Sequence, residues 1–127
     1  MNILRIYGGI FVDKLFLSIE EFNELLNQWK GQYIKVSKHE LEDLDETLMD
    51  LQNVSYKKND GTIDDYQSKY TMQLNGNGQI YTDNNQFRPL PHNQYDIPLE
   101  EDTLYEYDGN QFIISTERGI YKIEIEE

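Results

Sequence analysis

The chain has 127 residues and no cysteine, and its 24 acidic and 11 basic side chains give a formal net charge of −13 at pH 7. This length is typical of a single domain, so we expect residues 1–127 to form one compact unit. The missing cysteines exclude disulfides, thiol nucleophiles and thiolate metal sites. The strong negative charge disfavours unaided binding to nucleic acids or to an anionic membrane.

A short hairpin is predicted at the N-terminus. Ile3–Ile6 and Ile10–Val12 are apolar runs on either side of the pair Gly8-Gly9. Glycine adopts positive φ without steric cost, which a tight hairpin turn requires, so we expect the two runs to pair as strands.

A helix is predicted from Ile19 to Lys30. Ser18 and Glu21 fit the S-x-x-E capping box, in which each side chain satisfies a backbone N–H of the first turn. Gly31 follows the segment and is typical of a left-handed C-terminal stop. Apolar residues recur at helical spacing along one face, namely Ile19, Phe22, Leu25, Leu26 and Trp29.

The next segment begins with a predicted strand and then allows two interpretations. Tyr33–Ser37 alternates between apolar and polar residues, as a strand does. Ser37 and Glu40 fit a second capping box, which favours a second helix. The alternative ends that helix near Glu46 and begins a strand over Thr47–Tyr56, and apolar periodicity alone does not decide between the two. The leucines that fit the helix are Leu41, Leu44, Leu48 and Leu51.

From Asn53 onward the pattern changes to strands and tight turns. The turn dipeptides are Asp60-Gly61, Asn75-Gly76, Asn77-Gly78 and Asp108-Gly109. The strand-forming runs are Tyr70–Leu74, Gln79–Thr82, Thr103–Tyr107, Gln111–Thr116 and Ile120–Ile125. Three prolines within Arg88–Pro98 predict an ordered loop or an edge segment there. The expected fold is therefore α+β, with one or two N-terminal helices packed on a mostly antiparallel sheet built from successive hairpins.

Residues that could support catalysis are few. His39 and His92 are the two histidines, and Asp96 is the carboxylate that could orient His92 as a general base. A nucleophile motif is missing near either histidine, so we expect no catalytic residue and no enzyme activity. The acidic loops lack the glycine and the glutamate that a calcium-binding EF-hand loop requires, and zinc would need close sets of His or Cys. We therefore expect no metal and no cofactor.

The position of the acidic residues is more informative than their number. Two windows, residues 40–50 and 93–108, each carry six acidic residues and no lysine or arginine. Such runs are often solvated surfaces that only keep a protein soluble. They also provide the electrostatic attraction that steers a basic partner into place.

Tyrosines are interleaved with the acids of the second window. Tyrosine forms strands well, so cross-strand packing is one explanation. It is also favoured at binding surfaces, where it offers a large contact area with few rotatable bonds. The two features coincide in one stretch, and this predicts a partner-binding site made of Tyr95, Asp96, Glu100, Glu101, Asp102, Tyr105, Glu106, Tyr107 and Asp108.

The sequence favours a non-catalytic acidic protein that binds a basic protein partner and inhibits or neutralises it. Immunity proteins and phage inhibitors of bacterial defence act in this way. The alternative is a structural or accessory protein that associates with copies of itself. The missing alanine and the many Ile, Asn, Lys and Tyr residues indicate an AT-rich genome, as in a low-GC bacterium or its phage. Because targeting signals and membrane spans are missing, we expect a soluble, cytoplasmic protein.

Overall fold

The computed structural model describes residues 6–7, 10–11, 15–41, 43–59, 69–82 and 86–126. Eight strands form a large antiparallel sheet in the order β3-β11-β12-β13-β4-β5-β8-β9. Their bounds are β3 (Leu15–Leu17), β4 (Tyr33–Glu40), β5 (Asp43–Asp50), β8 (Gly78–Tyr81), β9 (Phe87–Pro89), β11 (Leu104–Tyr107), β12 (Gln111–Ser115) and β13 (Ile120–Ile125). Three strands form a small antiparallel sheet in the order β10-β7-β6, with β6 (Asn53–Lys58), β7 (Tyr70–Asn75) and β10 (Gln94–Leu99).

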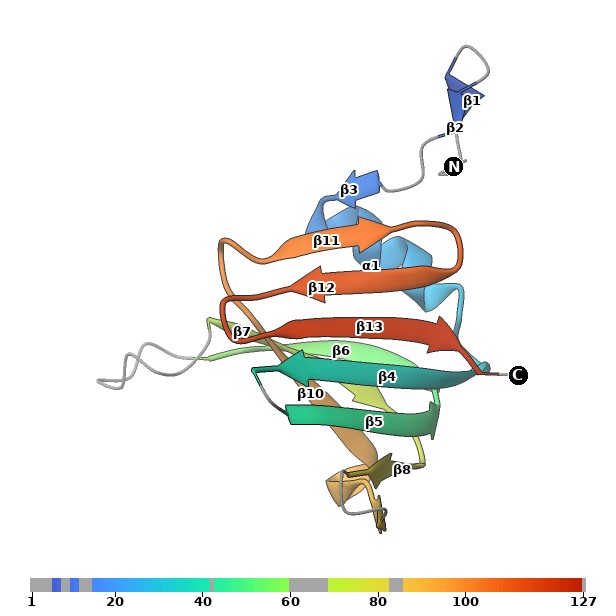
Figure 1. Ribbon diagram of the computed structural model, residues 1–127, viewed down its shortest axis with the longest axis vertical. Coiled ribbons are helices and arrows are strands. Elements are labelled where there is room, and N and C mark those ends of the chain that lie inside the picture. Colours follow the sequence, from blue (N-terminus) through green and yellow to red (C-terminus); the bar gives the residue numbers. More distant parts are fainter. Residues whose placement is uncertain are drawn as a thin grey trace.

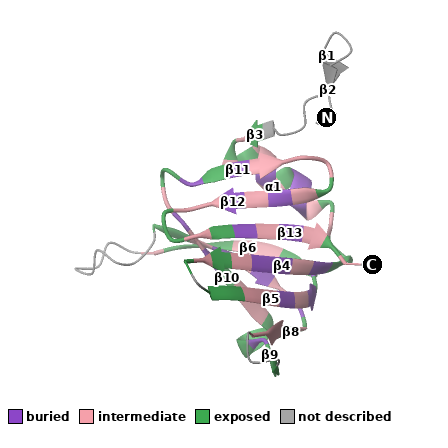
Figure 2. Cartoon of the chain, in the orientation of Figure 1, coloured by how far each residue is buried: buried purple, intermediate pink, exposed green. Residues whose placement is uncertain are grey.

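The small sheet and helix α1 (Ile19–Asn27) lie together on one face of the large sheet, which stands in front of them in Figure 1. The strands of the large sheet alternate between buried and more exposed residues (Figure 2). The buried residues form one hydrophobic core between the two layers. From the large sheet the fully buried members are Ile34, Val36, Met49, Phe112, Ile114 and Ile123, and from the small sheet Met72, Leu74 and Ile97.

Helix α1 begins where the sequence predicts. The Ser18 hydroxyl accepts a hydrogen bond from the Glu21 N–H at 3.1 Å, and the Glu21 carboxylate accepts one from the Ser18 N–H at 3.0 Å. The helix ends at Asn27, three residues earlier than predicted, and a turn follows in which Gly31 adopts φ +92°. Phe22, Leu25 and Leu26 bury the apolar face of the helix against the large sheet.

The predicted second helix is wrong, because residues 43–50 form strand β5. Strand β5 is hydrogen-bonded to β4 along its whole length and to β8 on its other side, so its backbone is satisfied as a strand. Ser37 is buried within β4 and therefore does not cap a helix. The alternative, a strand over Thr47–Tyr56, is closer to the structure, but β5 ends at Asp50 and the next strand, β6, begins at Asn53. The leucines that suggested a helix do not form one buried face. Leu44 and Leu48 lie on the outer face of the large sheet, and Leu41 is exposed in the turn between β4 and β5.

The proline-rich segment lies at sheet edges, as predicted. It contains β9 at the edge of the large sheet, the 3₁₀ turn η1 (Pro91–Asn93), and β10 at the edge of the small sheet. Proline lacks the N–H that an inner strand would donate, which explains the edge positions of Pro89 and Pro98. At the N-terminus, β1 (Ile6–Tyr7) pairs antiparallel with β2 (Ile10–Phe11), as the predicted hairpin requires. The turn pairs Gly8-Gly9 and Asp60-Gly61 lie outside the described residues.

The chain passes from the small sheet to the large sheet at Gly76. A Cβ atom at this position would lie 1.6 Å from the carbonyl oxygen of Asp50, which is far inside van der Waals contact. The Gly76 N–H donates to the carbonyl oxygen of Asn93 at 2.9 Å, which holds η1 against the crossing. The missing side chain is thus what allows the two sheets to approach here.

The outer face of the large sheet carries no second layer within the described part of the chain (Figure 1). Large apolar side chains stand exposed on it, including Phe16, Leu44, Phe87, Leu104 and Ile120. Among the helices that the structure describes, none has the length and apolar character needed to cross a membrane.

Candidate functional site

The tyrosines of the predicted partner-binding site point mainly into the core. Tyr105 is 9% exposed, and its ring centroid lies 5.2 Å from that of Phe22. Tyr107 stacks on Phe112 with a centroid distance of 4.5 Å, and its hydroxyl donates to the carbonyl oxygen of Gly109. The structure therefore places both rings where they stabilise the fold, and the part of Tyr105 that stays exposed lines the cavity described below.

The acidic residues of the predicted site separate into several places. Asp108 lies in the turn after β11, where its carboxylate accepts hydrogen bonds from the N–H groups of Asn110 and Gln111 at 2.9 and 3.0 Å. Partial burial alone would raise the pKa of Asp108, but these hydrogen bonds outweigh it and lower the pKa. Glu106 lies on the outer face of the large sheet. Asp108 and Glu106 are thus separated from the acids that precede β11.

Glu100, Glu101 and Asp102 stay together in the turn between β10 and β11. The Glu100 N–H donates to the Thr103 hydroxyl at 2.8 Å, which fixes the shape of this turn. The remaining two residues of the prediction, Tyr95 and Asp96, lie further back on β10. Tyr95 is half-buried, and Asp96 is exposed and accepts a hydrogen bond from the Gln94 amide at 2.7 Å.

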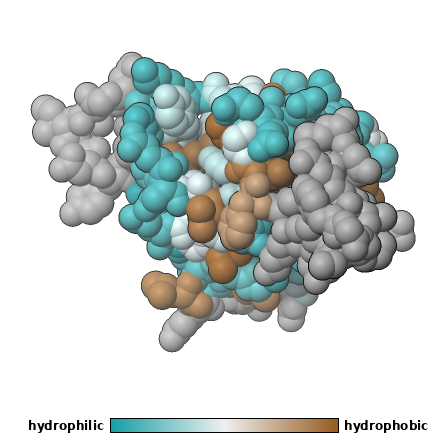
Figure 3. Space-filling model, turned by 90° about the horizontal axis from the view of Figure 1, so that it is seen from above, coloured by the Kyte–Doolittle hydropathy of each residue, from teal (hydrophilic) through white to brown (hydrophobic). Residues whose placement is uncertain are grey.

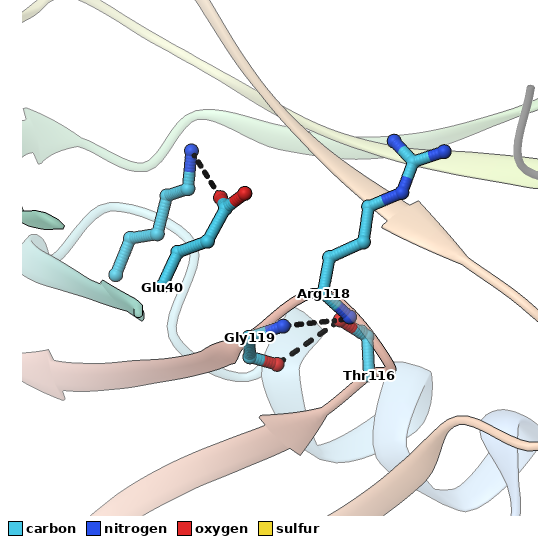
Figure 4. Close-up of polar contacts among 5 residues, drawn as sticks. Glu40, Thr116, Arg118 and Gly119 are labelled. Carbon is cyan, nitrogen blue, oxygen red and sulfur yellow. Dashed lines mark hydrogen bonds and ion pairs between the residues drawn. The ribbon is translucent and has the colours of Figure 1, made fainter. Parts of the chain in front are cut away.

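The turn at Glu100 meets two other turns at the same end of the molecule. Glu117, between β12 and β13, lies within hydrogen-bonding reach of Asp102. Gly119 in the same turn packs against the end of β4, because a Cβ atom there would lie 2.5 Å from the His39 carbonyl oxygen. Figure 4 shows this turn, held by the Thr116 hydroxyl, beside Glu40. We call this region the acidic end and define it as Glu40, Glu100, Glu101, Asp102 and Glu117.

The acidic end joins parts of both acidic windows of the sequence. Glu40 comes from the first window, and Glu100–Asp102 comes from the second. Glu117 belongs to neither window, and sequence reasoning missed it, because a single glutamate in a turn carries no signal. The contact between the turns arises from the antiparallel pairing of β13 with β4 and of β12 with β11.

Charge compensation at the acidic end is partial. Lys38 pairs with Glu40 at 3.1 Å, Lys69 pairs with Glu101, and Arg118 lies next to Glu117 in the turn between β12 and β13 (Figure 4). Glu117 instead meets other carboxyl groups: a hydrogen bond with Asp102 and the negative charges of Asp102 and Glu100 raise its pKa. Negative charges thus lie close together on one side of the acidic end. A positively charged partner would reduce the repulsion between them.

A cavity of about 480 Å³ opens beside the acidic end, and we call it the tyrosine pocket. Its apolar walls are Leu17, Ile19 and Leu99, its aromatic walls are Tyr56, Tyr70 and Tyr105, and its acidic rim is Glu100 and Glu101. Seen from above, the molecule shows apolar residues near the centre of the view with hydrophilic residues around them (Figure 3).

The polar groups of the tyrosine pocket are neutral. The Tyr56 hydroxyl donates to the Asn23 side chain at 2.7 Å, which ties the small sheet to α1. Burial raises the pKa of Tyr105 to about 12 and also raises that of Tyr56 well above its ordinary value. The phenol groups of Tyr56 and Tyr105 therefore keep their protons at neutral pH, and the carboxylates of the pocket, Glu100 and Glu101, lie at its rim.

The two histidines occupy different environments. His39 lies in β4 on the outer face and is exposed, rather than in a helix as expected. His92 lies in η1 and lines a second, smaller cavity together with Asp96. The described residues contain no group of three or more metal-ligating side chains.

The fold and these surfaces define an acidic, sheet-dominated α+β protein with a carboxylate-rich end next to a tyrosine-lined pocket. The chain belongs to the YmzB-like protein family, whose model matches residues 17–127. It is 32% identical over 114 residues to the uncharacterized protein YmzB of Bacillus subtilis (strain 168), a match that covers 82% of this chain and 95% of that protein. A comparison with solved structures finds no match. The composition indicates a low-GC bacterium or its phage, and this relative comes from a bacterium.

Proposed function

We propose that this chain is a non-catalytic binding protein that holds a basic protein partner at its acidic end. The observation that carries the proposal is the meeting of turns from distant parts of the chain, which gathers Glu40, Glu100–Asp102 and Glu117 at one end of the molecule. Crowded carboxylates cost folding free energy through mutual repulsion. A partner that brings lysine or arginine side chains converts that repulsion into attraction.

The tyrosine pocket supplies the apolar part of the same interface. Protein interfaces commonly have an apolar centre with a polar rim, and a few anchor side chains provide most of the binding energy. Here the rim carboxylates Glu100 and Glu101 belong to both the pocket and the acidic end. An aliphatic or aromatic side chain of the partner would fill the pocket while neighbouring basic residues engage the rim. If the basic surface of the partner is its functional site, binding of this chain would cover that site and inhibit the partner.

The experiment compares three versions of the chain as bait in a bacterial lysate. The acidic-end variant carries Glu100→Gln, Glu101→Gln and Asp102→Asn. A matched control carries Glu24→Gln, Asp50→Asn and Glu126→Gln, which changes the net charge equally but leaves the acidic end intact. We expect the wild type and the control to capture the same basic protein, identified by mass spectrometry, and the acidic-end variant to lose it.

Salt dependence provides a second readout on the captured partner. The Debye length falls from about 10 Å at 0.1 M salt to about 3 Å at 1 M, so the association rate of the wild type should fall over this range. The acidic-end variant should associate slowly at low salt as well. Equal association rates of all three versions, independent of salt, would contradict the proposal and leave the acids a purely solubilising role.

Self-association is the second candidate, and the outer face of the large sheet favours it. Leu44, Ile120 and Leu104 lie in one row across the sheet, separated by His39 and Ser115. Their side chains are 43%, 41% and 52% exposed. Exposed apolar patches on a sheet mark interaction surfaces. If copies pair through this row, sedimentation analysis should show a concentration-dependent dimer that Leu104→Lys with Ile120→Lys abolishes, whereas the acidic-end variant keeps it.

A further inference from the structure

The N-terminal hairpin, which we define as residues 3–12 and which contains β1 and β2, belongs to neither of the two larger sheets. Among the described strands, β1 pairs with β2 alone, and the two form a sheet of their own. An isolated two-stranded hairpin is at best marginally stable in water, because it cannot bury an apolar face. The hairpin therefore needs a surface to pack against.

The sequence of the N-terminal hairpin is apolar and basic, in contrast to the rest of the chain. Seven of its ten residues are aliphatic or aromatic, and its one charged residue is Arg5. All 24 acidic residues of the chain lie after it. A surface that covers the hairpin must therefore be apolar where the aliphatic and aromatic residues pack, and negatively charged where Arg5 lies.

The tyrosine pocket has both properties. Three aliphatic residues and three tyrosines form its walls, and its rim carries Glu100 and Glu101. Lys69 pairs with Glu101, whereas Glu100 forms no ion pair with any described residue. Glu100 is thus available to an arginine, which binds carboxylates through charge-assisted hydrogen bonds. The cavity of about 480 Å³ lies within the range of small-molecule pockets, about 300–1,000 Å³, so it accommodates more than one side chain.

The path of the chain favours the pocket of a second copy over the hairpin's own pocket. Strand β3 leads from the hairpin to the pocket, since Leu15 follows the hairpin and Leu17 lines the pocket. Within one copy, a reversal of the chain just before Leu15 would be needed to bring the hairpin back. A second copy imposes no such reversal, and exchange of identical elements between copies is a low-cost route to dimers.

We propose that the N-terminal hairpin of one copy fills the tyrosine pocket of a second copy, with Arg5 beside Glu100 of that copy, and that the exchange is reciprocal. Each copy then contributes the ten residues of its hairpin and the ten that line its pocket. Standard protein interfaces use about 20–30 residues a side, so we expect a reversible dimer. This inference does not rest on the proposed function, because it needs no foreign partner, and it uses a different surface from the outer face of the large sheet.

Sedimentation equilibrium of the intact chain measures this dimer. The hairpin variant, Ile10→Ser with Phe11→Ser, should keep the circular dichroism of the wild type and weaken the dimer at least tenfold, because it removes apolar groups from the pocket. Leu104→Lys with Ile120→Lys, which would abolish pairing through the outer face, should leave the affinity within about twofold. A wild type that stays monomeric up to millimolar concentration, or a hairpin variant that dimerises normally, would overturn the proposal.

A charge exchange tests the contact between Arg5 and Glu100. Arg5→Glu should weaken the dimer at least fivefold, and Glu100→Lys added to the same chain should restore the affinity to within about twofold of the wild type. Lys30→Glu changes the net charge by the same amount, but Lys30 follows the C-terminal end of α1, whereas the pocket lies at its N-terminal end. This control should change the affinity by less than about twofold. Equal losses for Arg5→Glu and Lys30→Glu would show that only the overall charge acts, and would overturn the contact.

Spin labelling distinguishes exchange between copies from docking within one copy. The chain has no cysteine, so a nitroxide attaches at a single site in Asn2→Cys. When this spin-labelled chain is mixed with isotope-labelled wild type, the pocket amide signals of Ser18, Leu99 and Thr103 in the wild type should broaden.

Two other results of this measurement would overturn the exchange. Broadening that occurs only when the nitroxide and the isotope are on the same chain would place the hairpin in its own pocket. No broadening in either sample would remove the hairpin from the tyrosine pocket altogether, and binding of the chain to phosphatidylglycerol vesicles would then assign the hairpin to a membrane surface.

Discussion

Replacement of Tyr105 by alanine tests whether this residue serves the fold or a partner. The ring is 9% exposed, and it packs on Phe22, which is completely buried and also contacts Phe112 at 5.0 Å between centroids. Removal of a large buried aromatic side chain costs about 3–5 kcal/mol, because it loses transfer free energy and leaves a cavity. Of this, the aromatic contact with Phe22 itself contributes about 0.5–1.5 kcal/mol.

The expected loss can be read from urea denaturation followed by circular dichroism. With a slope of about 2 kcal/mol per M, a loss of about 4 kcal/mol lowers the midpoint by about 2 M. Tyr105→Phe keeps the ring and should stay within about 1 kcal/mol of the wild type. Tyr33 offers a matched control, because it is a tyrosine on the outer face of β4 and is 43% exposed. Tyr33→Ala should cost about 1 kcal/mol or less.

A different result would refute this reasoning. If Tyr105→Ala kept the midpoint and slope of the wild type while it sped up dissociation of a captured partner, the ring would be a docking residue and its packing on Phe22 would be energetically unimportant. If Tyr33→Ala cost as much as Tyr105→Ala, burial would not be what distinguishes the two positions.

Three further predictions concern other parts of the chain. Ser18→Ala should lower the free energy of unfolding by about 0.5–2 kcal/mol, because the Glu21 N–H loses its acceptor, and an unchanged denaturation midpoint would contradict this. Gly76→Ala should yield little folded protein by circular dichroism, because its Cβ atom would meet the Asp50 carbonyl oxygen, whereas a normal spectrum would show that the two sheets can separate at no cost. Because the pKa of Asp108 is lowered in the folded protein, its contribution to stability is present above the ordinary value of 3.8 and is lost as the pH falls through the lowered value. Asp108→Asn should therefore reduce stability at pH 7 more than at pH 2, as measured by thermal unfolding at both pH values.

Local signals in the sequence determine much of this fold. The capping box at Ser18 and Glu21 places the start of α1, since both hydrogen bonds lie within one turn of chain. Alternation predicts β13, and the prolines predict the edge positions of β9 and β10. In each of these cases the interactions involve residues close in sequence or a backbone property of one residue type.

The leucines between residues 41 and 51 mark the limit of such signals. Their spacing favours a helix, yet the segment forms strand β5 between β4 and β8. Hydrogen bonding on both sides and the burial of Thr47 and Met49 outweigh the preference of the segment for a helix. Periodicity in one segment contains no information about which strands lie beside it.

The candidate sites show the same division for a physical reason. The sequence by itself determines the strong negative charge and the clustering of Glu100, Glu101 and Asp102. Only the tertiary structure turns Tyr105 and Tyr107 inward and brings Glu117 to Asp102. These contacts join strands that are far apart in the chain, and burial of the apolar faces between the two layers fixes which side chains are left to form a surface.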